Sequence, residues 1–367
     1  MLTVHPTLLI GPCDWDAERM PREEFAGRID ALWRHAPQAE RAIVFGSSRH
    51  HAELAYFTNF VPKLEPAVVV LARGGAHRLF VGSANMIGAA RPLTFIENVL
   101  PMKDMVDAIR SVRRPSIIVG ADYMPVAFRR SVMEAIGASE PPIDATAQAW
   151  SQMRRKSRCE LDAIDAAVKA TGAARKAMRE ALMSGAGATE VILAGERAAI
   201  AAGGQDVRTL FSKDGGRTLR PFFVPVKQKV DPLMVYLAIR RFNYWAECFP
   251  LFTTRPEPSR LYEKAWEAMG SAVSAIKAGV ATHEIGQLIA AAIRPYQTHP
   301  VTAPAFAQRM GLALEEPPYT DIGASFEEGE VYSLRIGATD EPRGSLICSY
   351  MIHVLADGVE GFEEGLP

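Results

Sequence analysis

The sequence predicts two domains: an N-terminal α/β domain with a mixed sheet, and a C-terminal α+β domain with a curved antiparallel sheet backed by helices. Three observations predict this arrangement. The length of 367 residues exceeds what one ordinary domain needs. Short apolar runs alternate with helical stretches in the first half. In the second half, long amphipathic helices come first and strands then alternate with helices.

Four short apolar runs predict strands in the first half, because each is bounded by glycine, proline or a turn. These runs span residues 41–46, 66–71, 78–81 and 116–120. The Gly74-Gly75 pair between the second and third runs predicts a hairpin. Helical stretches are expected over residues 24–33, 105–112 and 127–136. The alternation is typical of an α/β domain.

The domain boundary is expected between residues 140 and 158. Pro141-Pro142 breaks regular structure, and residues 153–158 form a polar, basic run. We therefore assign residues 1–153 to the first domain and 154–367 to the second.

Amphipathic helices dominate the start of the second domain. Apolar residues at spacings of three and four predict a long helix from about Glu160 to Gly185. Thr189 and Thr282 are expected to N-cap two further helices, and another helix is predicted over residues 259–278. Strands are predicted over residues 233–240, 245–253, 331–336 and 346–355.

Composition and charge exclude several classes of partner. Lys and Arg total 41 against 42 Asp and Glu, so there is no basic excess to bind nucleic acid or an anionic membrane. No apolar run approaches the roughly 20 residues of a membrane span. The scattered Cys13, Cys159, Cys248 and Cys348 form no disulfide framework, and the first residues lack the pattern of an export signal. We expect a cytoplasmic protein.

Five segments of the chain match motifs of one family in the same order. Residues 156–164 read Lys-Ser-Arg-Cys-Glu-Leu-Asp-Ala-Ile, and residues 311–318 read Gly-Leu-Ala-Leu-Glu-Glu-Pro-Pro. The other three segments are residues 49–60, 326–334 and 356–360. Together they resemble the creatinase, aminopeptidase P and prolidase family, whose catalytic domain has the pita-bread fold. The resemblance covers nearly the whole chain and implies a creatinase-like N-terminal domain followed by a pita-bread domain.

The resemblance also locates the metal site of the family, whose metal-dependent members use two Asp, one His and two Glu ligands. The corresponding positions here hold Tyr236, Glu247, Gln308, Arg335 and Ser349. Only one of the five is a carboxylate, and a guanidinium opposes a bound cation. We therefore predict no metal and no cofactor at this site.

The family's catalytic histidines are absent as well. The position after the proline that follows the Gly-rich turn holds Phe222, and the first position of the His-Glu-Pro-Pro motif holds Glu315. The sequence thus departs from the peptidases and from creatinase, which is metal-free but keeps a histidine base.

The replacement residues define a different pocket. Side chains alternate along a strand, so Glu247 shares a face with Trp245, and Ser349 shares a face with His353. One guanidinium, one carboxylate, hydroxyl groups and aromatic rings suit a small substrate that carries a carboxylate. Glu247 is the candidate base or nucleophile, and Arg335 is the anion anchor. His353 is a second catalytic candidate, although a histidine in such a position is more often a hydrogen-bonded core residue. The expected substrate-binding residues are Arg335, Gln308, Tyr236, Ser349, Trp245, Phe222, Phe60, Lys63 and His51.

The last three of these residues belong to the N-terminal domain. In the family that domain closes the pocket of the partner subunit, so His51, Phe60 and Lys63 are expected to reach a neighbouring site. The resemblance therefore predicts a homodimer with shared sites.

Three functions remain open at this stage. The first is a metal-independent hydrolase that acts on a C–N bond of a small carboxylate-bearing or zwitterionic substrate. The second is a catalytically inactive small-ligand-binding or scaffold protein. A pair between Arg335 and Glu247 is an alternative to substrate binding by Arg335 and is compatible with it. The third is an ordinary metallopeptidase.

Overall fold

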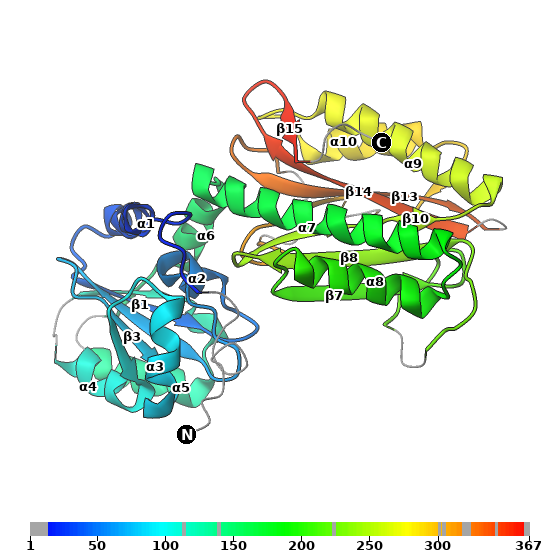
Figure 1. Cartoon of the computed structure of the whole chain (residues 1–367). Coiled ribbons are helices and arrows are strands. Elements are labelled where there is room, and N and C mark those ends of the chain that lie inside the picture. The colour runs from blue at the N-terminus through cyan, green and yellow to red at the C-terminus, as the bar shows by residue number, and fades with distance from the viewer. Residues whose placement is uncertain are drawn as a thin grey trace. The chain divides into compact units, whose positions relative to one another are not determined.

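The structure is a computed structural model that describes residues 14–111, 115–137, 141–221, 225–299, 302, 306–317, 324–341 and 344–362. The chain divides into two compact units, Met1–Met153 and Arg154–Pro367, drawn from blue to red along the chain in Figure 1. Phe222 and Cys13 lie outside the described residues. The two units are described separately below.

The N-terminal unit is built on a six-stranded mixed sheet in the order β4-β3-β2-β1-β5-β6. Strand β1 pairs antiparallel with β2 and parallel with β5. The predicted mixed sheet is therefore confirmed, with two further strands at its edges, β4 and β6. The strands are β1 Arg41–Gly46, β2 Ala67–Ala72, β3 Arg78–Val81, β4 Asn98–Pro101, β5 Ser116–Val119 and β6 Ile143–Asp144.

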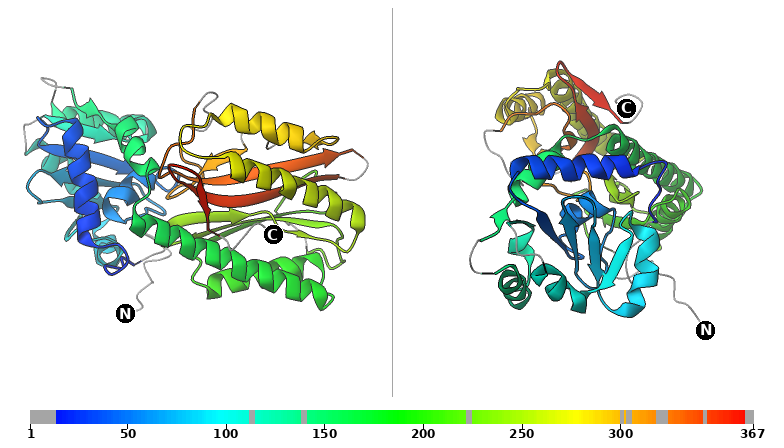
Figure 2. Two further views of the ribbon diagram at one scale, coloured as in Figure 1. Left: turned by 90° about the horizontal axis from the view of Figure 1, so that it is seen from above. Right: turned by 90° about the vertical axis from the view of Figure 1, so that its left-hand side faces the viewer.

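Helices cover both faces of this sheet, as the right-hand view of Figure 2 shows. Ile43 and Phe45 of β1 face Ile109 and Val132, which come from α4 and α5. The alternate residues of β1 face α2, which in turn packs against α1. Burial on both faces explains why the strand sequences are continuous apolar runs rather than alternating ones. The helices are α1 Arg22–His35, α2 Ala52–Thr58, α3 Ile87–Ala90, α4 Met105–Arg110, α5 Val126–Ile136 and α6 Thr146–Arg154.

The C-terminal unit contains two antiparallel sheets. In the first, β8 pairs with β7, β9 and β10, and in the second, β13 and β14 form the longest pair, flanked by β11, β12 and β15. The first sheet comprises β7 Asp206–Ser212, β8 Leu233–Arg241, β9 Tyr244–Cys248 and β10 Leu251–Phe252. The second comprises β11 Gln297–Thr298, β12 Ala307–Arg309, β13 Val331–Asp340, β14 Gly344–Val354 and β15 Val359–Gly361.

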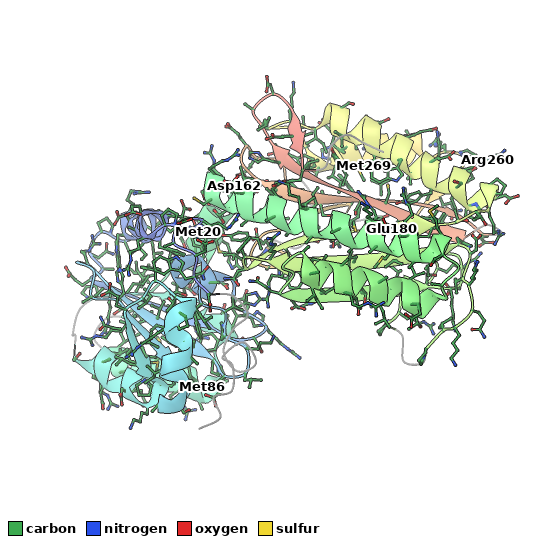
Figure 3. The ribbon with its side chains drawn as sticks, in the orientation of Figure 1. Met20, Met86, Asp162, Glu180, Arg260 and Met269 are labelled. Atoms are coloured by element: carbon green, nitrogen blue, oxygen red, sulfur yellow. The ribbon has the colours of Figure 1, made fainter. Side chains whose placement is uncertain are left out.

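Four helices back these sheets, in agreement with the predicted layout (Figure 1). Helices α7 and α8 cover the first sheet, and α9 and α10 cover the second. Figure 3 marks Asp162 near the beginning and Glu180 near the end of α7. The helices are α7 Arg158–Met183, α8 Ala188–Ala201, α9 Pro256–Ala275 and α10 Thr282–Ala292.

The helix starts differ in detail from the prediction. A capping box of Ser157 and Glu160 begins α7. Thr189 and Thr282 are not N-caps: Gly187 and Ala281 occupy those positions. The Thr189 hydroxyl instead accepts the Val226 amide at 2.7 Å, and the Thr282 hydroxyl donates to Ala324 O at 3.0 Å. Both threonine side chains thus form a hydrogen bond with a neighbouring loop.

Strand parity separates two faces in the C-terminal unit. Leu237 of β8 and Cys248 of β9 pack toward α7 and α8, and Cys348 of β14 packs toward α9. Their strand neighbours point the other way. We call the face away from the helices the polar face, and it carries Tyr236, Glu247, Ser333, Arg335 and Ser349.

No helix among the described residues is long and apolar enough to cross a membrane. Cys159, Cys248 and Cys348 are free thiols in this structure.

A buried ion pair ties the start of α7 to the loop after β12. Lys156 Nζ lies 2.7 Å from Glu316 Oε2, and the two side chains are 1% and 2% exposed. Burial raises the pKa of Glu316, whereas Lys156 and the Leu312 amide favour its charged form. The carboxylate depends on Lys156 to remain charged.

Replacing Lys156 by Met should lower the free energy of unfolding by about 3–5 kcal/mol, because it leaves a buried carboxylate unpaired. The double variant Lys156→Met/Glu316→Leu should recover most of this loss, and urea unfolding measures both. Arg158→Gln is the matched control, since its pair with Asp162 is solvent-exposed and should contribute less than about 1 kcal/mol. A single Lys156→Met variant as stable as the parent would contradict the argument.

Candidate functional site

Glu247 of β9 lies at the centre of the polar face with a fully buried side chain. Its Oε1 accepts hydrogen bonds from Ser333 Oγ at 2.7 Å and from Arg335 Nε at 2.5 Å. Its Oε2 accepts from Tyr236 OH at 3.1 Å and from Arg335 Nη2 at 2.8 Å. A carboxylate has about four acceptor positions, and all four are occupied here.

Arg335 forms a bidentate pair with Glu247 across the two sheets. Its side chain is 16% exposed, and Nη1 lies 3.8 Å from Glu315 Oε1. Burial alone would lower the pKa of Arg335, but the Glu247 carboxylate raises it overall. The edge formed by Nε and Nη2 is used by Glu247, which leaves Nη1 and the second proton of Nη2 for another anion.

Tyr236 of β8 donates its phenol proton to Glu247. Burial raises the pKa of Tyr236 strongly, and the charge of Glu247 adds to the shift. The phenol therefore stays protonated at any working pH and serves as a donor. Its ring packs on Phe249, with 4.9 Å between the ring centroids.

The strand register places Gln308 and Ser349, the other two residues expected at the site, next to this cluster. Gln308 of β12 is paired with Ser333, and Ser349 of β14 is paired with Arg335. Directly paired residues of antiparallel strands present their side chains on one face. The structure thus brings together all five positions that the family resemblance marks. Ser349 Oγ is buried and has no hydrogen-bond partner in the part of the chain that the structure describes.

His353 lies apart from this cluster. It is four residues beyond Ser349 on β14, which separates the two by about 13 Å along the strand. Its Nδ1 lies 3.8 Å from Glu360, and it lines a small pocket with Asp162 and Asp165 of α7. Burial lowers the pKa of His353, and Glu360 partly offsets this. The structure therefore does not bring His353 to Glu247.

Trp245 is buried beneath two guanidinium groups. Its ring lies 4.5 Å from Cζ of Arg208 and 5.4 Å from Cζ of Arg240. With 1% exposure, Trp245 supports these two side chains.

Arg208 is a polar-face residue that the sequence analysis missed. The register places Arg208, Ala238 and Glu247 in one row across β7, β8 and β9. Its side chain is 54% exposed, and its charge acts on the Tyr236 hydroxyl. The sequence pattern that could have revealed this strand is the alternation within residues 206–212. Val207, Thr209 and Phe211 form its helix-facing side.

The residues expected from the N-terminal unit have varied environments. His51 is the N-cap residue of α2, and Lys63 is exposed. Phe60 is only 1% exposed, so it packs in the core of its own unit, contrary to the expectation that it contacts substrate. Phe222 lies outside the described residues.

The residues of the polar face do not fit a metal ion. The described residues contain no group of three or more His, Cys, Asp or Glu side chains that could hold one. The single carboxylate, Glu247, has its acceptor positions filled, and the guanidinium of Arg335 would oppose a cation by about 1–4 kcal/mol at 4 Å.

Comparison with known proteins identifies the family. The model of metallopeptidase family M24 matches residues 144–357, more than half of the chain. The chain belongs to the M24 family, the class to which the fold and the position of the site point. No curated protein sequence matches the chain.

Solved structures show the same fold at low sequence identity. The X-Pro aminopeptidase from Thermotoga maritima MSB8 is 14% identical, with a TM-score of 0.77 over 93% of this chain and 97% of that chain. The prolidase from Pyrococcus horikoshii OT3 is 16% identical, with a TM-score of 0.72 over 94% of this chain and 100% of that chain. These similarities confirm the pita-bread fold.

Purified protein grown with Mn, Co, Zn and Fe in the medium should contain far less than one ion per chain, because no ligand set is available on the polar face. Elemental analysis after gel filtration measures the content. One ion or more per chain, retained after brief chelation, would contradict the prediction that the polar face holds no metal.

Proposed function

We propose that the chain is a metal-independent hydrolase that cleaves a C–N bond in a small carboxylate-bearing or zwitterionic substrate. The observation that carries the proposal is the bidentate Arg335–Glu247 pair. By resemblance, these two positions correspond to metal ligands of the family. Membership of a hydrolase family supports the reaction class, and the replacement residues support the substrate class.

Arg335 would anchor the anionic group of the substrate. The guanidinium edge that carries Nη1 has only a 3.8 Å contact with Glu315, whose side chain is 52% exposed. A substrate carboxylate can replace that weak contact and form two charge-assisted hydrogen bonds. Arg208 supplies a second positive charge on the same face, so an anion meets two guanidinium groups there.

Glu247 would act as the general base. It has to release one donor before it can accept a proton, and the 3.1 Å hydrogen bond from Tyr236 is the longest of the four. Glu247 would then take a proton from the attacking water and return it to the leaving nitrogen.

A second candidate function is small-ligand binding without turnover. The observation that favours it is the occupation of all four acceptor positions of Glu247, since a carboxylate held this way is a poor base. Binding and turnover therefore have to be measured separately.

Glu247→Gln should lower kcat by about 10²–10⁴-fold while substrate binding persists, because general-base catalysis contributes that much. Arg335→Lys should instead weaken binding by about 10-fold or more, because it removes bidentate recognition. A thermal-shift screen of dipeptides, N-acyl amino acids and small betaines finds the ligand, and turnover is then measured on each hit.

Lys169→Gln serves as control, since Lys169 is an exposed residue of α7 that pairs with Asp165. Unchanged turnover in Glu247→Gln would overturn the assignment of the base. Binding of a hit without any product in the parent protein would favour the second candidate.

We further propose that the protein is a cytoplasmic homodimer in which His51 and Lys63 of one subunit approach the site of the other. Lys63 supports this role because it is exposed and positively charged. Sedimentation should give twice the chain mass of 40.1 kDa. A species of single-chain mass at micromolar concentration would contradict the shared site.

A further inference from the structure

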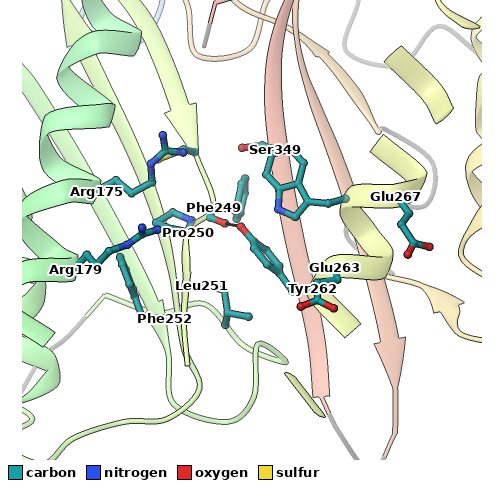
Figure 4. Close-up of a pocket in the computed structure, with 12 residues that line it drawn as sticks. Arg175, Arg179, Phe249, Pro250, Leu251, Phe252, Tyr262, Glu263, Glu267 and Ser349 are labelled. Carbon is teal, nitrogen blue, oxygen red and sulfur yellow. Dashed lines mark hydrogen bonds between the residues drawn. The ribbon is translucent and has the colours of Figure 1, made fainter. Parts of the chain in front are cut away.

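A large cavity lies between α7 and α9 (Figure 4). Its volume is about 560 Å³, within the range of roughly 300–1,000 Å³ that is usual for small-molecule sites. Its walls come from α7, α9 and residues 248–252, and Ser349 borders it as well.

The cavity adjoins the polar face and shares Ser349 with it. Cys248, which lines the cavity, alternates along β9 with Glu247 and therefore points to the opposite side. Two other lining residues touch the polar-face cluster. Ser349 is paired with Arg335, and the Phe249 ring packs on Tyr236.

The two helices that line the cavity, α7 and α9, carry side chains of opposite charge. Arg175 and Arg179 are one turn apart on α7, and Glu263 and Glu267 are one turn apart on α9. Figure 4 shows the two arginines reaching from α7 and the Glu263 carboxylate on the α9 side. Glu267 is already paired with Lys264 at 2.7 Å, which makes Glu263 the available carboxylate.

Apolar and aromatic side chains line the cavity between the arginines and the glutamates. Tyr262 packs edge-on against Trp266, and its hydroxyl donates to Phe249 O at 2.8 Å. The ring of Tyr262 is therefore fixed as a wall. Leu251 and Phe252 complete the apolar lining.

An unsatisfied polar atom lies at the edge of the cavity. Ser349 is 8% exposed, and its Oγ has no hydrogen-bond partner among the residues that the structure describes. A buried hydroxyl without a partner is unfavourable, and a polar atom of a bound ligand would satisfy it.

We propose that this cavity binds a small zwitterion with an apolar or aromatic body, such as an aromatic amino acid or a dipeptide. Its carboxylate lies toward Arg179 and Arg175, and its ammonium group lies toward Glu263. The site is separate from the proposed catalytic cluster, and a ligand in it contacts Ser349 and Phe249, the neighbours of Arg335 and Tyr236. A ligand bound in the cavity therefore influences the geometry of the side chains around Glu247.

Calorimetric titration with L-phenylalanine, L-tryptophan and L-alanyl-L-phenylalanine tests the proposal. At least one should bind, and its N-acetyl and C-amide derivatives should bind at least about 10-fold more weakly, a loss of about 1.4 kcal/mol. Arg179→Gln and Glu263→Gln should each weaken binding similarly. Lys176→Gln and Glu257→Gln are matched controls on exposed positions of the same helices and should leave binding unchanged.

Two further variants separate this site from the catalytic cluster. Leu251→Trp should abolish binding by filling the cavity, and Arg335→Lys should leave it intact. Loss of binding in Arg335→Lys together with normal binding in Arg179→Gln and Glu263→Gln would overturn the proposal, as would a failure of all three probes to bind at millimolar concentration. Neither result depends on turnover, so these experiments do not test the proposed hydrolase activity, which is tested separately.

Discussion

The ion pair between Glu247 and Arg335 joins the two sheets of the C-terminal unit, and the rest of the site depends on it. Glu247 belongs to β9 in the first sheet, and Arg335 belongs to β13 in the second. A fully buried carboxylate requires a charged partner and hydrogen-bond donors, and Arg335, Ser333 and Tyr236 supply them. By the family resemblance, these positions correspond to metal ligands of the metal-dependent members. In this chain the guanidinium of Arg335 provides the positive charge beside Glu247.

This substitution changes what the fold can do. A metal site attracts the polar groups of a substrate to the ion, whereas the Arg335–Glu247 pair is already neutral as a unit. The remaining positive edge of Arg335 and the exposed Arg208 favour an anion. A cavity with separated charges, lined by Phe249 and Ser349, adjoins the polar face. Both features are built on the fold that the chain shares with its relatives.

Much of the fold followed from the sequence because long periodic elements carry strong signals. Continuous apolar runs predicted the central strands of the N-terminal sheet, and helical spacing predicted α7. Alternation along the strands and the family resemblance correctly grouped Tyr236, Glu247, Gln308, Arg335 and Ser349. Edge strand β7, with its mixed composition, was missed, and Arg208 was missed with it. His353 lies far from Glu247 because it is four residues beyond Ser349 on β14. The alternation of side chains along a strand predicts which face a residue lies on but not this distance. The burial of Phe60 and the cavity between α7 and α9 depend on tertiary packing, which no local pattern encodes.

The filled acceptor positions of Glu247 limit what a substitution at this site can achieve. A glutamate at position 335 alone would set two buried carboxylates against each other with no cation between them, at a cost of several kcal/mol. The other ligand positions hold Tyr236, Gln308 and Ser349, so no single replacement rebuilds a metal site. A metal centre on this framework would therefore require several simultaneous replacements, because a single one leaves either an unpaired buried charge or an incomplete ligand set.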